Sequence, residues 1–269
     1  MKEELIVLGT GNASVTKCYN TCFAIKDENG DYFLVDAGGG NGILTQLEKS
    51  DIDVTSIHHM FLTHEHTDHL LGAVWMIRII ATAMTKGRYE GDFSIYCHKE
   101  LGETLDTIAR LTLTPKFYSM VHTRIQFIPV EHGETKEILN YKVTFFDIHS
   151  IKAKQFGFTT ILNNGKKLTC CGDEPYQEHC YEYAKEADWL LHEAFCLYEE
   201  REIYHPYEIS HSTVKDACDL AHQLDVKNLV MWHTEDDNIK KRKSLYKKEG
   251  RKYYKGNIFV PYDLERIAL

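Results

Sequence analysis

One short segment rich in histidine constrains this chain more than any other feature. Residues 63–69 (THEHTDH) follow an apolar stretch, residues 57–62, and hold three histidines and an aspartate. In an extended segment, side chains two positions apart point the same way, so His64 and His66 can bind one metal ion. Imidazole nitrogens suit zinc, iron and similar divalent ions, and an added carboxylate favours a second cation. The segment therefore predicts half of a dinuclear metal site.

The second pair of candidate ligands, Asp68 and His69, opens the next predicted element. Apolar residues recur behind this pair at helical spacing, at positions 70, 71, 74, 77 and 80. The pair is therefore predicted at a helix N-terminus, where free amides and the helix dipole also favour a hydroxide or a phosphate oxygen. A solvated loop that gathers histidines by chance is the alternative, and the regular spacing argues against it.

Length and composition place the chain among large globular proteins. Its 269 residues can bury a substantial core, and no Pro/Gly/Ser-rich linker divides them, so we expect one domain over residues 1–269. The N-terminus enters a strand directly, and no apolar run is long enough for a signal peptide or a membrane helix. These features predict a cytoplasmic protein without a membrane partner. Eight cysteines without a CxxC pair indicate reduced, buried thiols.

The charge is distributed unevenly. The net charge is −9, yet residues 240–255 hold nine basic residues against Glu249 alone, a local charge of +8. The rest of the chain therefore carries −17. Such a run is typical of a solvated helix or loop, and it could also neutralise the phosphate backbone of RNA near an active site.

Strands and helices are predicted to alternate along the chain. Strands are expected at residues 5–8, 21–26, 32–35, 60–62, 94–97, 125–129, 143–148, 158–162 and 168–171. Helices are expected at residues 42–48, from 68 to about 85, 178–187 and 212–224. Mixed elements in this order indicate an α/β sandwich.

A dinuclear centre needs further ligands, which are expected where apolar strands end in a polar residue. His149, Asp173 and His233 each follow such a run. His132 precedes a glycine in a polar stretch and is the alternative to His149. The sequence thus offers a complete set of His and Asp ligands without a cysteine.

Taken together, the HxHxDH segment, a later His, a Gly-Asp pair and a final His resemble the metallo-β-lactamase superfamily. The resemblance runs from residue 8 to the strand near residues 257–269. It implies a four-layer αββα sandwich with two divalent metal ions at one edge of the sheets, zinc first, with iron and manganese also suited to such ligands. The implied ligands are His64, His66 and His149 for one ion, Asp68, His69 and His233 for the other, and Asp173 as the bridge.

Two further motifs resemble the ribonuclease Z branch of that superfamily. They are residues 190–195 (LLHEAF) and residues 211–213 (HST). By resemblance, Glu193 and His211 form a charge-relay pair. A simpler interpretation of residues 211–213 is a helix N-cap at Ser212 or Thr213, and both interpretations can hold together.

The chain departs from ribonuclease Z between His149 and Asp173 and at residues 19–21, where the arginine usual in that family is replaced. That family carries a long arm that grips transfer RNA, whereas here only 23 residues separate His149 from Asp173. The step from His149 to Gly157 is also longer than the family favours. The resemblance therefore implies the metal chemistry without the arm.

The favoured hypothesis is a metal-dependent phosphodiesterase. Asp68 or Asp173 would orient the attacking hydroxide, and His211, oriented by Glu193, would donate a proton to the leaving alkoxide. Its substrate would be a phosphodiester, with RNA bound through residues 240–255. The alternative is a small-molecule hydrolase acting on a cyclic nucleotide, another phosphodiester, a sulfate ester or a lactone. A non-catalytic metal-binding or nucleic-acid-binding module is disfavoured, because structural zinc sites are closed by four ligands and usually include Cys. By resemblance, a homodimer is one expectation. The apolar helix around residues 75–80 suits either an interface or the core, and burial in the core is favoured.

Overall fold

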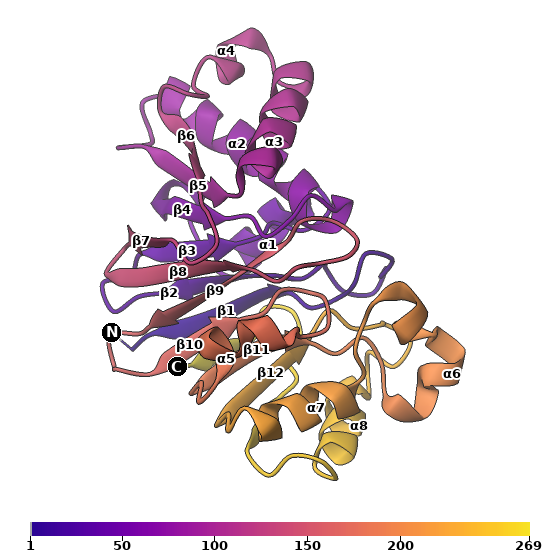
Figure 1. Cartoon of the computed structure of the whole chain (residues 1–269). Coiled ribbons are helices and arrows are strands. Elements are labelled where there is room, and N and C mark those ends of the chain that lie inside the picture. The colour runs from indigo at the N-terminus through magenta and orange to yellow at the C-terminus, as the bar shows by residue number, and fades with distance from the viewer. Residues whose placement is uncertain (1) are drawn as a thin grey trace.

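Two mixed sheets form the centre of the molecule. The computed structural model describes residues 2–269, and these hold two seven-stranded sheets that pack face to face (Figure 1). The first sheet has the order β14 (Arg266–Ala268), β1 (Glu4–Gly9), β2 (Cys22–Lys26), β3 (Tyr32–Val35), β4 (Ile57–Phe61), β5 (Phe93–Cys97) and β6 (Ile125–Pro129). The second has the order β13 (Asn257–Phe259), β12 (Asn228–Trp232), β11 (Trp189–Glu193), β10 (Lys167–Cys170), β9 (Phe156–Ile161), β8 (Tyr141–Asp147) and β7 (Thr135–Ile138).

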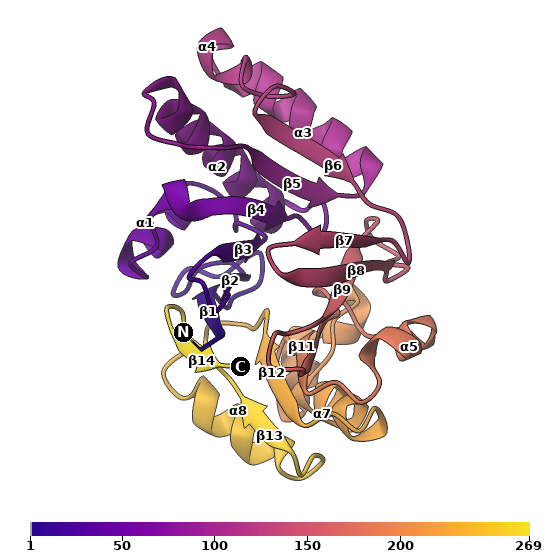
Figure 2. The same cartoon turned by 90° about the vertical axis from the view of Figure 1, so that its left-hand side faces the viewer.

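Helices cover the outer face of each sheet (Figure 2). The first sheet is covered by α1 (Gly42–Lys49), α2 (Thr67–Thr85), α3 (Lys99–Thr112) and the short α4 (Pro115–Tyr118). The second is covered by α5 (Tyr181–Ala184), α7 (Val214–Gln223) and α8 (Arg242–Gly250), while α6 (Arg201–Tyr204) projects to one side (Figure 1). Short 3-10 helices lie at η1 (Val54–Ser56), η2 (Glu178–Cys180), η3 (Tyr198–Glu200) and η4 (Pro206–Ile209). No helix within residues 2–269 is long and apolar enough to cross a membrane.

Alternation along the strands separates three apolar cores. In β1, Ile6 and Leu8 face the helices of the first sheet, whereas Leu5 and Val7 face the second sheet. This is the period of two that a strand buried on both faces requires. Between the sheets, the ring of Phe61 lies 4.9 Å from that of Phe145. Burial of each such side chain contributes about 1.5–3 kcal/mol. The predicted four-layer αββα architecture is thereby confirmed.

Both sheets carry a run of parallel strands, and this directs several loops to one edge. In the first sheet β3, β4, β5 and β6 are parallel, and in the second β10, β11, β12 and β13 are parallel. Polar residues that follow the carboxyl ends of such strands meet outside the sheet. Residues 63–69 follow β4, Asp173 follows β10 and His233 follows β12.

A close backbone approach positions the start of α2. The Gly72 amide donates a hydrogen bond to the Gly38 carbonyl over 2.8 Å. A Cβ atom at Gly72 would lie only 1.8 Å from the carbonyl oxygen of Ala37, so glycine is required here. This contact fixes the first turn of α2, which carries Asp68 and His69.

Candidate metal centre

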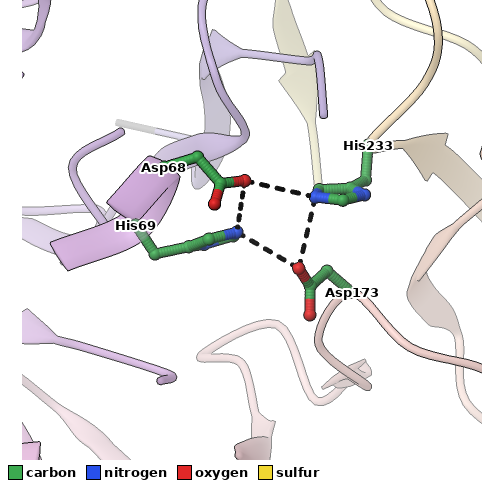
Figure 3. A group of neighbouring side chains, drawn as sticks. All are labelled: Asp68, His69, Asp173 and His233. Atoms are coloured by element: carbon green, nitrogen blue, oxygen red, sulfur yellow. Dashed lines mark ion pairs between the residues drawn. The ribbon is translucent and has the colours of Figure 1, made fainter. Parts of the chain in front are cut away.

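Four buried side chains converge where the two sheets meet. Asp68 and His69 come from α2, and Asp173 and His233 from the loops after β10 and β12 (Figure 3). The Nε2 atom of His69 lies 3.2 Å from an oxygen of Asp68 and 3.2 Å from Asp173 Oδ2. The Nε2 atom of His233 lies 3.2 Å from the same Asp173 oxygen and 3.5 Å from Asp68. These atoms surround one point at the spacing of ligands around a metal ion.

A second group of side chains shares Asp173 with the first. The Nε2 atom of His64 lies 2.8 Å from Nδ1 of His66 and 3.5 Å from Asp173 Oδ2. All three ligand atoms lie within 4.8 Å of one another. One carboxylate therefore adjoins both groups, as a bridging ligand would.

The donor set fits divalent metal ions. The Nε2 atoms of His69 and His233 lie beside carboxylates but make no hydrogen bond of acceptable geometry, and Nδ1 of His233 is buried without a hydrogen-bond partner among the described residues. Buried polar atoms are normally paired, and an unpaired one carries the full desolvation penalty. Nitrogen and carboxylate ligands without a thiolate match catalytic rather than structural zinc sites.

The electrostatics of the site favour bound cations. Burial alone would raise the pKa of Asp173, but His64 and His233 hold it well below its ordinary value. Burial likewise opposes ionisation of Asp68, whose pKa is nevertheless lowered by His69 and His233. Burial also lowers the pKa of His64 well below its ordinary value, which leaves the ring neutral. Ionised carboxylates and neutral imidazoles are the forms that bind metal. Against the effect of burial, Asp68 and Asp36 raise the pKa of His69 well above its ordinary value, so this ring would exchange a proton for a bound cation.

Asp36 supports the ligands from behind, although it lies outside the predicted set of site residues. It is buried at the end of β3 with a φ of 55°. One carboxylate oxygen lies 2.8 Å from His69 Nδ1, and the other accepts a hydrogen bond from the Thr63 amide over 2.9 Å. This contact turns the Nε2 atom of His69 toward the cluster, as carboxylates behind metal-binding histidines commonly do.

Replacing Asp36 by asparagine should weaken metal binding about 10- to 100-fold, because the ring of His69 loses its anionic partner. Competition with a chromophoric chelator measures the dissociation constant. Asp27→Asn is a matched control, since Asp27 is equally buried but accepts hydrogen bonds from the turn between β2 and β3. Equal losses in both variants would assign the effect to general destabilisation.

The structure does not bring His149 to the cluster, contrary to the predicted ligand set. Its side chain is exposed, its φ is 54°, and its ring stacks on His179 with 3.7 Å between centroids. The long segment between His149 and β9 instead turns the buried Gln155 inward, with Nε2 3.0 Å from His64 Nδ1 and in contact with Asp173. The alternative ligand, His132, also lies outside, where its Nδ1 accepts from the Asp147 amide.

Glu193 and His211 lie beside the cluster, as the predicted pair requires. Glu193 ends β11, is fully buried and accepts a hydrogen bond from Ser212 Oγ over 2.6 Å. His211 directs Nδ1 toward Glu193 Oε2 at 3.6 Å, and its ring lies 5.1 Å from that of His233. The N-cap of α7 is Thr213, in a capping box with Asp216, so capping and the pairing coexist.

A cleft of about 330 Å³ opens onto the cluster. Its lining includes Asp68, Asp173 and His233 together with His211. Phe195 stacks on the His211 ring at 4.9 Å with an interplanar angle of 10°. The cleft therefore exposes both the candidate ligands and the candidate acid to one small substrate volume.

Comparison with known proteins agrees with this geometry. The family model described as anti-Pycsar protein Apyc1 matches residues 3–252. The ribonuclease Z of Thermococcus sibiricus is 27% identical over 311 aligned residues, covering 99% of this chain and 96% of that protein. The metallo-β-lactamase fold protein YhfI from Bacillus subtilis superposes with a TM-score of 0.79 at 15% identity, covering 99% of each chain. The short form of human tRNase Z superposes with a TM-score of 0.73 at 21% identity, covering 98% of each chain.

These likenesses confirm the predicted resemblance to the metallo-β-lactamase superfamily and to ribonuclease Z. The matched family model covers far more than half of the chain. The fold, the order of the motifs and the convergent His and Asp side chains all agree with that match. The chain belongs to the family described as anti-Pycsar protein Apyc1.

Proposed function

We propose that the chain is a metal-dependent phosphodiesterase with a dinuclear centre. The observation that carries the proposal is Asp173, whose Oδ2 atom lies within 3.5 Å of ligand nitrogens from both groups. The names of the similar proteins, ribonuclease Z and tRNase Z, support a phosphodiester substrate. We assign two ions, with zinc first and iron or manganese as alternatives. The proposed ligands are His64, His66 and Asp173 for one, and Asp68, His69, Asp173 and His233 for the other.

Divalent cations held in this way lower the pKa of bound water and neutralise charge on a phosphoryl group. The side chains of the chain supply the rest of the proposed mechanism. Asp68 or Asp173 would accept a hydrogen bond from the attacking water and orient it. His211 faces the cleft through Nε2, because its Nδ1 faces Glu193. Nε2 would protonate the leaving alkoxide, while the Glu193 carboxylate would stabilise the imidazolium.

The shape of the site favours a small phosphodiester over RNA. Strands β9 and β10 are joined by a short hairpin turn, so no arm extends from residues 150–172. The cleft volume lies in the range of small-molecule sites, about 300–1,000 Å³. Its lining also includes Glu235, Asp236 and Asp237, whose negative charge disfavours a polyanion. A cyclic nucleotide fits these constraints. The matched family is described as an anti-Pycsar protein, and we propose that this chain likewise acts against Pycsar.

The basic segment 240–255 keeps RNA as the second candidate. Some of its cations have internal partners: Arg242 is fully buried, Lys243 pairs with Glu265, and Lys252 pairs with Glu199. Others are exposed before, along and after α8, namely Lys240, Lys241, Lys247, Lys248 and Lys255. Exposed lysines at this density favour contact with a phosphate backbone.

We also propose a homodimer, formed through exposed apolar side chains of α2 and α3. Leu71 and Trp75 on α2 are 36% and 38% exposed, and Leu111 on α3 is 72% exposed. Apolar side chains gathered on adjoining helices favour association with another protein surface. Sedimentation equilibrium measures the mass in solution.

The decisive test offers the metal-loaded protein three substrates: bis(p-nitrophenyl) phosphate, a panel of 2′,3′- and 3′,5′-cyclic mononucleotides, and a 3′-extended transfer RNA. We expect hydrolysis of the small diester and of at least one cyclic nucleotide, with none by Asp68→Ala. Cleavage of the RNA at one defined position would favour the second candidate and assign a role to residues 240–255. No hydrolysis of any of the three substrates would contradict the proposed function and direct the search to sulfate esters and lactones.

A further inference from the structure

The loop between β8 and β9 contributes one cationic side chain, Lys152, to the lining of the cleft. Lys152 Nζ lies 3.5 Å from His211 Nε2 and donates a hydrogen bond to the carbonyl of Ile209 over 3.0 Å. Its side chain is 28% exposed. Lys152 therefore lies at the side of His211 that faces the cleft, opposite the side that faces Glu193.

Charge in the cleft gives this lysine its significance. Among the described residues that line the cleft, Lys152 is the single lysine or arginine. Five carboxylates share the lining: Asp68, Asp173, Glu235, Asp236 and Asp237. Two of them are proposed metal ligands, and Asp236 and Asp237 already pair with Lys17, a residue outside this lining, which leaves Lys152 as the cation that faces the cleft. A phosphodiester anion would need a cation of the protein in addition to the metal ions.

A structural role alone does not account for Lys152. Its Nζ atom lies 3.7 Å from the buried carboxylate of Glu174. This ion pair would be structural if it were needed to hold the loop in place. Ser150 Oγ already donates a hydrogen bond to the same Glu174 oxygen over 2.7 Å. Ser150 Oγ also accepts from the Lys152 and Ala153 amides, so the loop is held without the ammonium group.

We propose that Lys152 forms an anion site in this cleft and binds a non-bridging phosphoryl oxygen of the substrate. A lysine ammonium is a compact charge on a flexible stem, so it can shift from Ile209 to a phosphoryl oxygen without moving the backbone. Placed beside His211, it would stabilise charge on phosphorus while His211 serves the leaving oxygen. The substrate role rests on the proposed function, whereas the anion site does not.

The same loop provides a matched control. Lys154 is two residues along, but its Nζ lies 3.0 Å from Glu100 Oε2, outside the lining of the cleft. We compare Lys152→Met, Lys152→Arg and Lys154→Met after confirming equal metal content and equal thermal unfolding. Calorimetry gives the dissociation constant of inorganic phosphate, and bis(p-nitrophenyl) phosphate gives kcat and KM.

Lys152→Met should weaken phosphate binding about 10- to 100-fold and lower kcat/KM similarly. Lys152→Arg should recover most of both values, and Lys154→Met should match the parent protein. Unchanged phosphate affinity in Lys152→Met, or an equal loss in Lys154→Met, would overturn the proposal. A phosphate affinity in Lys152→Arg as low as that of Lys152→Met would also overturn it. Phosphate binding needs no turnover, so a selective loss in a protein inactive on diesters would retain the anion site and reject the proposed function.

Discussion

Replacing Asp173 by alanine should remove at least one of the two metal ions and lower kcat by at least about 10³-fold. The reason is geometric, because one oxygen of this carboxylate adjoins His64, His69 and His233 at 3.5 Å or less. No other side chain belongs to both metal-ligand groups formed around His64 and His69 in the described chain. Metal analysis after gel filtration and hydrolysis of bis(p-nitrophenyl) phosphate measure the two effects.

Glu174→Gln is the matched control for this change. Glu174 is the next residue and equally buried, but its carboxylate contacts Ser150 and Lys152. This variant should keep both metal ions. Full metal occupancy in Asp173→Ala would disprove the bridging role and would leave two independent sites.

Replacing His211 by alanine should leave both metal ions bound and slow the reaction selectively. Hydrolysis of diesters with alkoxide leaving groups should fall about 10²- to 10⁴-fold, since positioned acids contribute this much. The p-nitrophenolate group leaves without a proton, so bis(p-nitrophenyl) phosphate should lose much less. Comparing kcat for an alkyl diester and an aryl diester measures the difference.

His222→Ala controls for removal of a histidine from the same region. His222 is exposed near the end of α7 and does not line the cleft. It should leave both rates unchanged. Equal losses on alkyl and aryl diesters in His211→Ala would assign His211 to substrate binding or metal support instead of proton transfer.

Local spacing explains why much of the site could be predicted. The run from His64 to His69 and the polar residues after β10 and β12 are visible in the sequence, because each follows an apolar strand. The position of His149 depends on how the residues before β9 fold in three dimensions. The long segment between His149 and β9 turns Gln155 inward and leaves His149 beside His179. No periodic pattern in the sequence indicates which of these two side chains points toward the cluster.

Other differences have distinct physical causes. Asp36 is a lone carboxylate after a strand, and only the folded loop reveals its contact with His69. Helix α3 was not predicted, although Leu101, Leu105 and Ala109 recur at helical spacing; its N-cap is His98, a residue that seldom signals a helix start. The expected helix at residues 178–187 is reduced to η2 and α5.

The basic segment illustrates a different limit of sequence reasoning. Composition counts Arg242 among the solvated cations, but its guanidinium is buried and donates hydrogen bonds to Thr10, Thr234 and the carbonyl of Pro261. These contacts join the start and the end of the chain near the cleft. Charge counts cannot separate such a structural arginine from the exposed lysines around it.

The ligands at the edge of the sandwich are drawn from both sheets. His64, His66, Asp68 and His69 follow a strand of the first sheet, and Asp173 and His233 follow strands of the second. An ion bound between them is therefore linked thermodynamically to the docking of one sheet on the other. Free metal at 100 times its dissociation constant adds about 2.7 kcal/mol to the free energy of unfolding. Metal supply would thus raise the stability of the folded protein as well as its activity.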